Sequence, residues 1–152
     1  MDYTYRKAEA SDAQRIAELF EEMLRTIYHT PDVKGYDDGY LDRFFAGGDD
    51  VIYVAEREKE VVAFLSVEAY REDGYLYLDD FAVTAACRHQ GIGTKLIGLA
   101  EDYAASTGIP AIVLHVEKTN GSAHQLYQKL GYGDHEDQGN RILMVKELGK
   151  QS

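Results

Sequence analysis

The chain of 152 residues is 45% hydrophobic and 28% charged, and it carries a formal net charge of −11. This length and composition are typical of one soluble globular domain, which we expect to span residues 1–152. The acidic balance argues against nucleic-acid binding, which needs a basic surface, and no apolar run is long enough to cross a bilayer. We therefore expect no nucleic-acid partner and no membrane partner.

Simple sequence features indicate the cellular location of the protein and the role of its net charge. The first residues lack the basic and then apolar organisation of a signal peptide. The single cysteine, Cys87, excludes an internal disulfide framework, and the cytoplasm is the simplest location. The net charge either serves solubility or steers a cationic, amine-bearing substrate toward the protein.

The N-terminal part predicts a strand at residues 4–8 followed by an amphipathic helix. Ser11 and Gln14 fit a capping box, with Ser11 as the N-cap residue. The expected buried stripe of the helix consists of Ile16, Leu19, Phe20, Met23, Leu24 and Ile27.

Residues 29–48 are irregular in pattern, with a short helix expected near residues 38–45. The region is either a solvated loop with aromatic side chains tucked into the core, or the rim of an acceptor-binding site. Its aromatic and acidic residues, with the tyrosine just before them, are Tyr28, Tyr36, Tyr40, Asp32, Asp37, Asp38 and Asp42.

The remaining elements alternate between strands and helices. A hairpin is predicted from residues 51–56 and 61–70, followed by a strand at 75–83, a helix from Gly93 to about Ser106, and an apolar strand at 111–116. The strand–helix–strand order predicts one parallel pair within an otherwise antiparallel sheet. A helix at 122–130 and two closing strands near 132–136 and 141–148 complete the chain. The predicted class is α+β (an α/β three-layer arrangement), with a mixed, mostly antiparallel central sheet of about six to seven strands flanked by helices.

The turn between the strand at 75–83 and the following helix has the composition of an anion site. Unpaired amides at a helix start favour a phosphate, Gly91 and Gly93 let a bulky anion approach the main chain, and Arg88 adds a positive charge. A P-loop is excluded by the order of residues around Lys95, and a dinucleotide fingerprint is excluded because its third glycine position holds Leu96. The sequence therefore predicts a pyrophosphate-binding loop.

The pattern Arg88-x-x-Gly91-x-Gly93 resembles the loop of the GNAT superfamily of acetyl-CoA-dependent N-acetyltransferases. In that family the R/Q-x-x-G-x-G/A loop holds the coenzyme A pyrophosphate and the preceding strand pairs with the pantetheine arm. The resemblance implies the GNAT acyl-CoA N-acyltransferase fold and acetyl-CoA as co-substrate. The residues that it implies in cofactor binding are Phe81, Ala82, Val83, Arg88, His89, Gln90, Gly91, Ile92, Gly93 and Thr94.

A second stretch, Asn120 to Tyr132, resembles the same family, whose pattern here is Asn-x-x-Ala, a tyrosine, and a Gly-Phe or Gly-Tyr after the helix. Asn120, Ala123 and Tyr127 match it and join the implied cofactor-binding residues. A positioned phenol with a pKa of about 10 can protonate a leaving coenzyme A thiolate, so the resemblance implies that Tyr127 is the general acid. The alternative for Tyr127 is an ordinary amphipathic core tyrosine.

The sequence identifies the general base less clearly than the general acid. Asp79 and Asp80 are the nearest candidates, and a regular strand places them on opposite faces. Glu68 on the adjacent strand is a further candidate, and a structural salt bridge is the alternative for either aspartate.

Other reactive residues give weaker signals. The five histidines show no metal-binding spacing, which predicts no metal site. His124 either contacts the ligand or is a solvated helix residue, and Cys87 is either a reactive thiol near a helix start or a passive loop residue.

The function implied by both motifs is transfer of the acetyl group of acetyl-CoA to a primary amine of a small-molecule acceptor, by direct attack in a ternary complex. Residues 77–83 and 89–92 resemble aminoglycoside N-acetyltransferases locally, and the acidic charge suits a cationic acceptor. Polyamines, other small amines and protein or peptide amines are alternative acceptors, and a non-catalytic acyl-CoA-binding module is an alternative function. Because members of the family often dimerise, a homodimer is one implied assembly.

Overall fold

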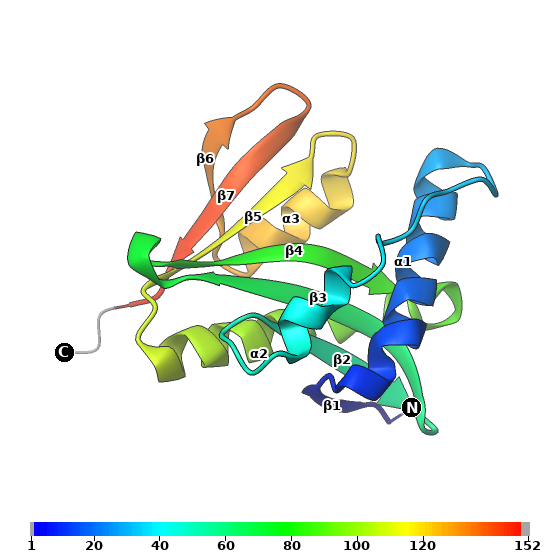
Figure 1. The fold of residues 1–152 in the computed structure, drawn as a ribbon. Helices are drawn as coiled ribbons and strands as arrows, with labels where there is room; N and C mark the ends of the chain where they lie inside the picture. Colours follow the sequence, from blue (N-terminus) through cyan, green and yellow to red (C-terminus); the bar gives the residue numbers. More distant parts are fainter. Residues whose placement is uncertain (1, 150–152) are drawn as a thin grey trace. The chain divides into compact units, whose positions relative to one another are not determined.

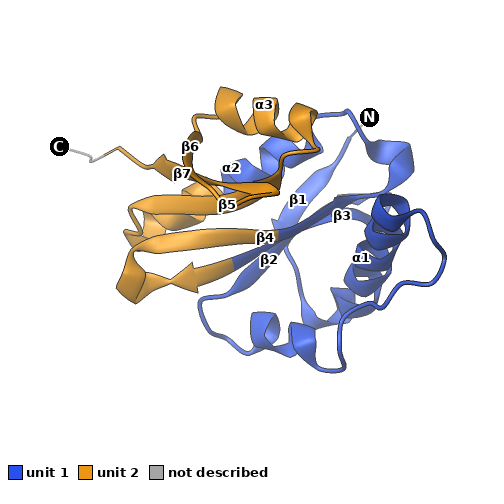
Figure 2. Cartoon of the chain, turned by 90° about the horizontal axis from the view of Figure 1, so that it is seen from above, with its two compact units in different colours: residues 1–67, 80–99 blue, residues 68–79, 100–152 orange. Residues whose placement is uncertain are grey.

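The structure is a computed structural model that describes residues 2–149. The chain divides into two compact units, one of Met1–Val67 with Asp80–Leu99 and the other of Glu68–Asp79 with Ala100–Ser152 (Figure 2). The helices are α1 (Ala13–Tyr28), α2 (Ile92–Thr107) and α3 (Gly121–Lys129). The strands are β1 (Thr4–Lys7), β2 (Val51–Arg57), β3 (Glu60–Tyr70), β4 (Tyr75–Val83), β5 (Ala111–Glu117), β6 (Gly133–Asp137) and β7 (Arg141–Glu147).

The strands form a seven-stranded sheet in the order β1-β2-β3-β4-β5-β7-β6 (Figure 1). The β1–β2, β2–β3, β5–β7 and β6–β7 pairs are antiparallel, whereas β4 and β5 run parallel. A parallel pair needs a crossover connection, which α2 supplies here. The predicted α+β class and the mixed, mostly antiparallel sheet are confirmed.

In the first unit, α1 lies on an apolar cluster built from the sheet and from the segment that follows the helix. Ile16 and Leu19 of α1 are buried together with Val54, Phe64 and Ala82. Burial of apolar surface of this kind is the main stabilising term of a small domain. Because Ala82 is the next-to-last residue of β4, this core also fixes the end of the strand from which the glycine loop departs.

The end of α1 differs from the prediction. Ile27 was predicted to belong to the buried stripe, but its side chain is 54% exposed, because the last turn of α1 extends beyond the apolar cluster. The helix ends at His29 in a left-handed conformation. From there the chain turns into the segment that leads to a short 3-10 helix, Tyr40–Phe45, close to the expected short helix.

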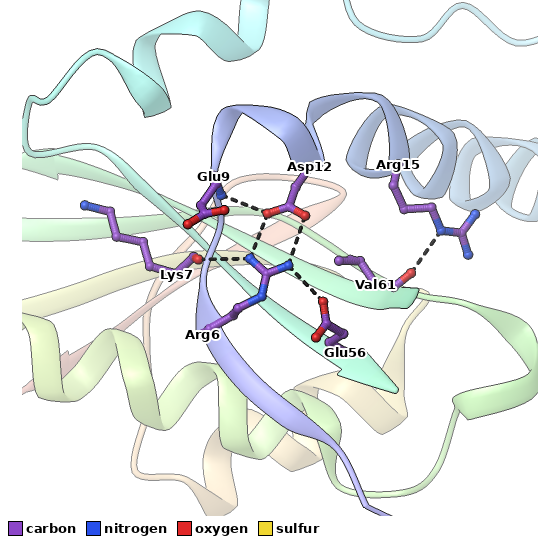
Figure 3. A network of polar contacts seen from close by, with 7 residues as sticks. All are labelled: Arg6, Lys7, Glu9, Asp12, Arg15, Glu56 and Val61. Carbon is purple, nitrogen blue, oxygen red and sulfur yellow. Dashed lines mark hydrogen bonds and ion pairs between the residues drawn. The ribbon is translucent and has the colours of Figure 1, made fainter. Parts of the chain in front are cut away.

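The start of α1 also differs, since Ser11 is not the N-cap residue. A capping box is formed instead by Glu9 and Asp12 around the 3-10 helix Ala10–Asp12 that precedes α1 (Figure 3). The amide of Glu9 donates to Asp12 Oδ2 at 2.8 Å, and Arg6 donates to both oxygens of the same carboxylate at 2.8 and 3.0 Å. Arg6 also donates to Glu56 Oε2 of β2 at 3.0 Å, so this cluster of charges joins β1, β2 and the start of α1 (Figure 3).

In the second unit, β5 is central to the sheet. Its residues Ile112, Leu114 and Val116 are buried, and they alternate with half-buried side chains. The parallel register places Tyr77 of β4 beside Val113 and Leu78 beside Leu114. No helix within residues 2–149 combines the length and the apolar composition that a membrane span requires.

Candidate active site

The glycine loop lies where the sequence predicts it, between the end of β4 and the start of α2. After Val83 the chain forms a short 3-10 turn, Ala85–Cys87, and then passes through Arg88 in an extended conformation. His89 and Gly91 both have positive φ, 63° and 78°, and α2 begins directly afterwards. The first amides of α2 have no intrahelical partner, and with the helix dipole they favour an anion at this position.

The two glycines of the loop are required for different reasons. At Gly91 the backbone is left-handed and a Cβ would meet nothing within 4 Å, so the requirement is conformational and the space beside the main chain is open. At Gly93 a Cβ would lie 2.7 Å from Cζ of Phe81. The absent Cβ of Gly93 therefore makes room for the Phe81 ring, and binding of an anion by the main chain at both glycines stays a prediction.

Arg88 is held by the protein on two sides. Its Nε donates to the carbonyl of Val83 at 3.1 Å, and its Nη2 lies 3.9 Å from Glu22 Oε2. Glu22 of α1 also accepts from the Thr84 hydroxyl at 3.0 Å and from the amide of Ala85 at 3.1 Å. One carboxylate of α1 thus fixes the start of the loop and part of the Arg88 guanidinium.

Glu22 was missed in the sequence analysis. A signal was present, because Glu22 is flanked by the apolar stripe residues Leu19 and Met23 and is half-buried in the structure. An acidic residue at the border of a buried helix face needs a partner, but the sequence alone does not identify a partner that is 62 residues away.

A cleft of about 820 Å³ opens beside the glycine loop within the first unit. The Tyr3 hydroxyl donates to Gln90 Oε1 and both residues line the cleft, so β1 and the segment before it contribute to this side of the loop. The lining residues are Asp2, Tyr3, Tyr5, Gln90, Gly91, Thr94 and Lys95. A ligand held by the loop amides therefore has space beside it, and the contribution of Tyr3 and Tyr5 was not predicted from the sequence.

Of the candidate bases, Asp80 has the most defined surroundings. The Tyr36 hydroxyl donates to Asp80 Oδ2 at 2.7 Å, and the Asp80 amide donates to Ser66 Oγ at 2.9 Å. Asp79 is exposed, as expected for the neighbour of a half-buried residue on a strand. Glu68 is only 6% exposed, and its carboxylate accepts from the Tyr70 hydroxyl at 2.7 Å.

In the second unit, Asn120 is the N-cap residue of α3. Its Oδ1 accepts from the amide of Ala123 at 3.2 Å and from the Ser122 hydroxyl at 3.3 Å. This is the ordinary role of asparagine at a helix start. The Asn-x-x-Ala pattern therefore has a structural basis in the cap of α3.

Tyr127 lies on α3 and is half-buried. Its ring makes an edge contact with Tyr132, with the centroids 6.3 Å apart, and burial raises the pKa of its phenol above the ordinary value of 10.0. The amide of Tyr132 donates to the Tyr127 carbonyl at 3.0 Å, so the Gly-Tyr pair after α3 folds back onto the helix.

Tyr132 itself belongs to the core of the second unit. Its hydroxyl donates to Glu101 Oε2 at 3.0 Å, and Lys146 Nζ donates to the same oxygen at 3.0 Å. Burial, with the Glu101 charge as a smaller cause, raises the pKa of the Tyr132 phenol far above its ordinary range. Of the two aromatic residues in this motif, Tyr132 is therefore structural and Tyr127 is the candidate proton donor.

The structure also gives the surroundings of the remaining candidate residues, Cys87 and His124. Cys87 is fully buried, which agrees with a passive loop residue. His124 Nε2 lies 2.7 Å from Asp134 Oδ1 on the partly exposed face of α3. Within residues 2–149 no group of three or more His, Cys, Asp or Glu side chains has metal-binding geometry.

Comparison with known proteins identifies similar chains. The model of the Acetyltransferase (GNAT) family matches residues 16–132. The Bacillus subtilis (strain 168) protein named uncharacterized N-acetyltransferase YhfO is 30% identical over 131 residues, which are 84% of this chain and 87% of that protein.

Two solved structures show the same fold. The paia N-acetyltransferase from Thermoplasma acidophilum, in complex with coenzyme A, has a TM-score of 0.79 and 18% identity over 97% of this chain and 100% of that chain. The yncA protein from Salmonella typhimurium, with its cofactor acetyl-CoA, has a TM-score of 0.79 and 21% identity over 100% of this chain and 97% of that chain.

Proposed function

Since the chain belongs to the acetyltransferase (GNAT) family, we propose that it transfers the acetyl group of acetyl-CoA to a primary amine of a small, cationic acceptor. The family assignment and the enzyme class agree with the resemblance found in the two sequence motifs. The solved structures of the same fold that hold coenzyme A or acetyl-CoA support acetyl-CoA as the donor.

The observation that carries the proposal is the glycine loop at the start of α2. Gly91 has open space beside its main chain, the first amides of α2 are free of intrahelical partners, and a cleft of about 820 Å³ lies alongside. These features fit a bulky diphosphate. We assign Arg88 to Thr94 (Arg88, His89, Gln90, Gly91, Ile92, Gly93 and Thr94) to the pyrophosphate, with Gly93 acting through its close contact with Phe81.

The end of β4 is assigned to the pantetheine arm, with main-chain groups of Phe81, Ala82 and Val83 as its partners. Asn120 and Ala123 are assigned to the same co-substrate through the cap of α3 that they form. The buried Ala82 and the Phe81–Gly93 contact support this assignment, because they hold this strand end in one conformation.

Proton transfer is assigned to one phenol and one carboxylate. Bound acetyl-CoA supplies an acetyl thioester whose leaving group is a thiolate. Asp80, or its exposed neighbour Asp79, takes a proton from the acceptor ammonium, directly or through water, and leaves a neutral amine that can attack. The Tyr127 phenol gives its proton to the leaving sulfur, and the second proton that the nitrogen loses as the amide forms returns to the Tyr127 phenolate through water.

The acidic composition supports a cationic acceptor. A net charge of −11 favours the approach of ammonium groups, and it would oppose a polyanionic acceptor. A protein or peptide amine is the second candidate acceptor class, and a non-catalytic acyl-CoA-binding module is the second candidate function.

The test is release of the coenzyme A thiol over a panel of amines, paired with calorimetry of acetyl-CoA binding. We expect binding of acetyl-CoA together with thiol release on at least one aminoglycoside or polyamine. Release only with peptide amines would move the acceptor to the second class. Binding without release on any amine would favour the non-catalytic module, and no binding would contradict the donor assignment.

A further inference from the structure

The segment that follows α1 packs against that helix and holds the Tyr36 side chain in place. The rings of Tyr36 and Tyr40 from this segment and of Phe20 from α1 form a stack, with Tyr36 in the middle. The centroid of the Tyr36 ring lies 4.0 Å from that of the Phe20 ring, at an interplanar angle of 8°, and 4.8 Å from that of the Tyr40 ring, at an angle of 7°. Tyr40 in turn contacts Phe44, which is buried in the apolar cluster of the first unit.

Two glycines shape the backbone next to this stack. A Cβ at Gly35 would lie 2.8 Å from Cγ of Glu21, so the backbone passes close to α1 immediately before Tyr36, and a larger residue would have to displace the Glu21 side chain. Gly39 has a φ of 80° and turns the chain into the short 3-10 helix that begins with Tyr40. The stack is therefore determined by local chain geometry as well as by aromatic packing.

Because both faces of the Tyr36 ring are covered, this ring cannot stack on a ligand. What it presents is its hydroxyl, which donates to Asp80 Oδ2 at 2.7 Å. The other end of Asp80 is fixed as well, since its amide donates to the hydroxyl of Ser66, a residue that is only 2% exposed. The carboxylate is thus held by its side chain and by its backbone.

From this geometry we infer that Tyr36 is a positioning residue that orients the Asp80 carboxylate toward the acceptor amine. The inference rests on the proposed function, in which Asp80 receives the ammonium proton. A hydrogen bond from the phenol to Oδ2 fixes the side-chain rotamer and stabilises the ionised carboxylate, which is the form that binds a cation and accepts a proton. The segment after α1 would then act on the acceptor through Asp80 and not by stacking on it.

The first experiment measures the carboxylate itself and needs no substrate. The titration of Asp80 is followed by carboxyl-carbon NMR in the wild type and in Tyr36→Phe, with the signal assigned by its loss in Asp80→Asn. Removing the phenol should move the midpoint to higher pH, because the ionised form loses a hydrogen bond. An unchanged midpoint would overturn the inference.

The charged side chains on the elements around Asp80 are the same in all these proteins. They include Glu21 and Glu22 of α1, Lys34 and Asp37, which pair with each other at 3.2 Å, Glu68 of β3, and Asp79 beside Asp80 on β4. The matched control is Tyr28→Phe, since Tyr28 is 66% exposed at the end of α1, and we expect it to leave the midpoint unchanged.

The second experiment connects the carboxylate to the acceptor. In Tyr36→Phe we expect kcat/KM for the amine to fall about 10- to 100-fold, the effect of a hydrogen bond to a charged group, with the Kd of acetyl-CoA unchanged and the acid limb of the pH profile moved to higher pH. In the Asp80→Asn background the same change should add little, because the positioning residue then has nothing to orient.

The outcomes separate the two claims. An equal loss from Tyr36→Phe in both backgrounds would show that the hydroxyl does not act through Asp80, and would overturn the inference. A shifted midpoint together with unchanged amine kinetics in Asp80→Asn would leave Tyr36 as the partner of Asp80 but overturn its role toward the acceptor. Absence of acetyl transfer by the wild type would contradict the proposed function instead.

Discussion

At the scale of single residues, the two phenols of the α3 motif differ in their partners. Tyr132 is buried and donates to Glu101, whereas within residues 2–149 no hydrogen bond is formed by the hydroxyl of the half-buried Tyr127. A proton donor has to be able to give its proton to a ligand, so Tyr127 and not Tyr132 suits that role.

The first prediction concerns Tyr127→Phe. Because only a hydroxyl is removed, we expect kcat to fall about 10²- to 10⁴-fold, the usual contribution of a general acid, with the Kd of acetyl-CoA nearly unchanged. Steady-state kinetics and calorimetry measure the two quantities. Gln125→Ala, on the exposed side of the same helix, is the control, and a Tyr127→Phe enzyme with wild-type turnover would remove Tyr127 from the mechanism.

The second prediction concerns pH and Asp12. Hydrogen bonds from Arg6 lower the pKa of the Asp12 carboxyl below its ordinary value of 3.8. A group whose pKa is lower in the folded state stabilises the fold above its ordinary pKa, and this contribution is lost as the pH falls through the lower, folded-state pKa. Asp12→Asn should therefore reduce the free energy of unfolding by about 1.5–3 kcal/mol at pH 7, and by progressively less below about pH 4.

Urea unfolding at several pH values measures this difference. Asp73→Asn, a change at an exposed carboxyl, is the control and should have little effect at any pH. A destabilisation by Asp12→Asn that stays constant down to pH 2 would contradict the role of the Arg6–Asp12 pair (Figure 3).

At the scale of elements, the conformation of the glycine loop depends on the side chains that pack against it. The third prediction uses Gly93, whose Cβ would lie 2.7 Å from Phe81, and Gly98 of the same helix, where a Cβ would meet nothing within 4 Å. Gly93→Ala should cost about 1–3 kcal/mol of stability through overpacking and should weaken acetyl-CoA binding. Gly98→Ala should stabilise the protein by up to about 1 kcal/mol, because alanine is the better helix former.

Thermal unfolding and calorimetry distinguish the two variants. Adding Phe81→Leu to Gly93→Ala should restore part of the lost stability, since the smaller side chain relieves the contact. Equal stabilities for the Gly93 and Gly98 variants would show that the Phe81 contact does not determine the loop.

The fourth prediction concerns Glu22, which joins α1 to the loop. Glu22→Ala removes the bonds to Thr84 and Ala85 and should raise the Kd of acetyl-CoA about tenfold by loosening the loop, with a smaller effect on KM for the amine. Glu18→Ala, a change one turn earlier at a 52% exposed side chain, is the matched control. An unchanged Kd in Glu22→Ala would show that the loop keeps its conformation without α1.

The sequence predicts these elements well wherever the signal is local. The β4–loop–α2 order and the parallel strand pair follow from patterns within a few residues of one another. The missed partners are distant in the chain: Tyr36 is 44 residues from Asp80, and Tyr3 is 87 residues from Gln90. No periodicity encodes such pairs, because the packing of α1 and β1 on the sheet brings them together.

Local details of the structure have a similar cause. Ser11 is of the residue type that caps helices, but the Asp12 carboxylate accepts hydrogen bonds from Arg6 and from the amide of Glu9. The capping box therefore forms closer to the N-terminus. At Gly93 the space left by the absent Cβ is filled by the ring of Phe81. In both cases a side chain from a neighbouring strand decides the outcome.

At the scale of the whole molecule, the family match covers residues of both compact units. A single domain over residues 1–152 and a homodimer stay predictions, and residue 1 and residues 150–152 lie outside the described part of the chain.

The net charge of −11 favours a cationic acceptor, while the co-substrate is an anion. An acidic protein needs a specific local site for such an anion, and the loop before α2 is the candidate.

The most direct test of that site is calorimetric titration with acetyl-CoA and with acetyl-pantetheine, which carries the same thioester but lacks the diphosphate and the adenosine 3′-phosphate; the loss caused by Gly91→Val isolates the part due to the loop. If the amides between Arg88 and Thr94 hold the diphosphate, acetyl-CoA should bind at least about 100-fold more tightly than acetyl-pantetheine, and Gly91→Val should abolish most of that difference. Equal affinities for the two compounds, or no heat with acetyl-CoA, would contradict the account.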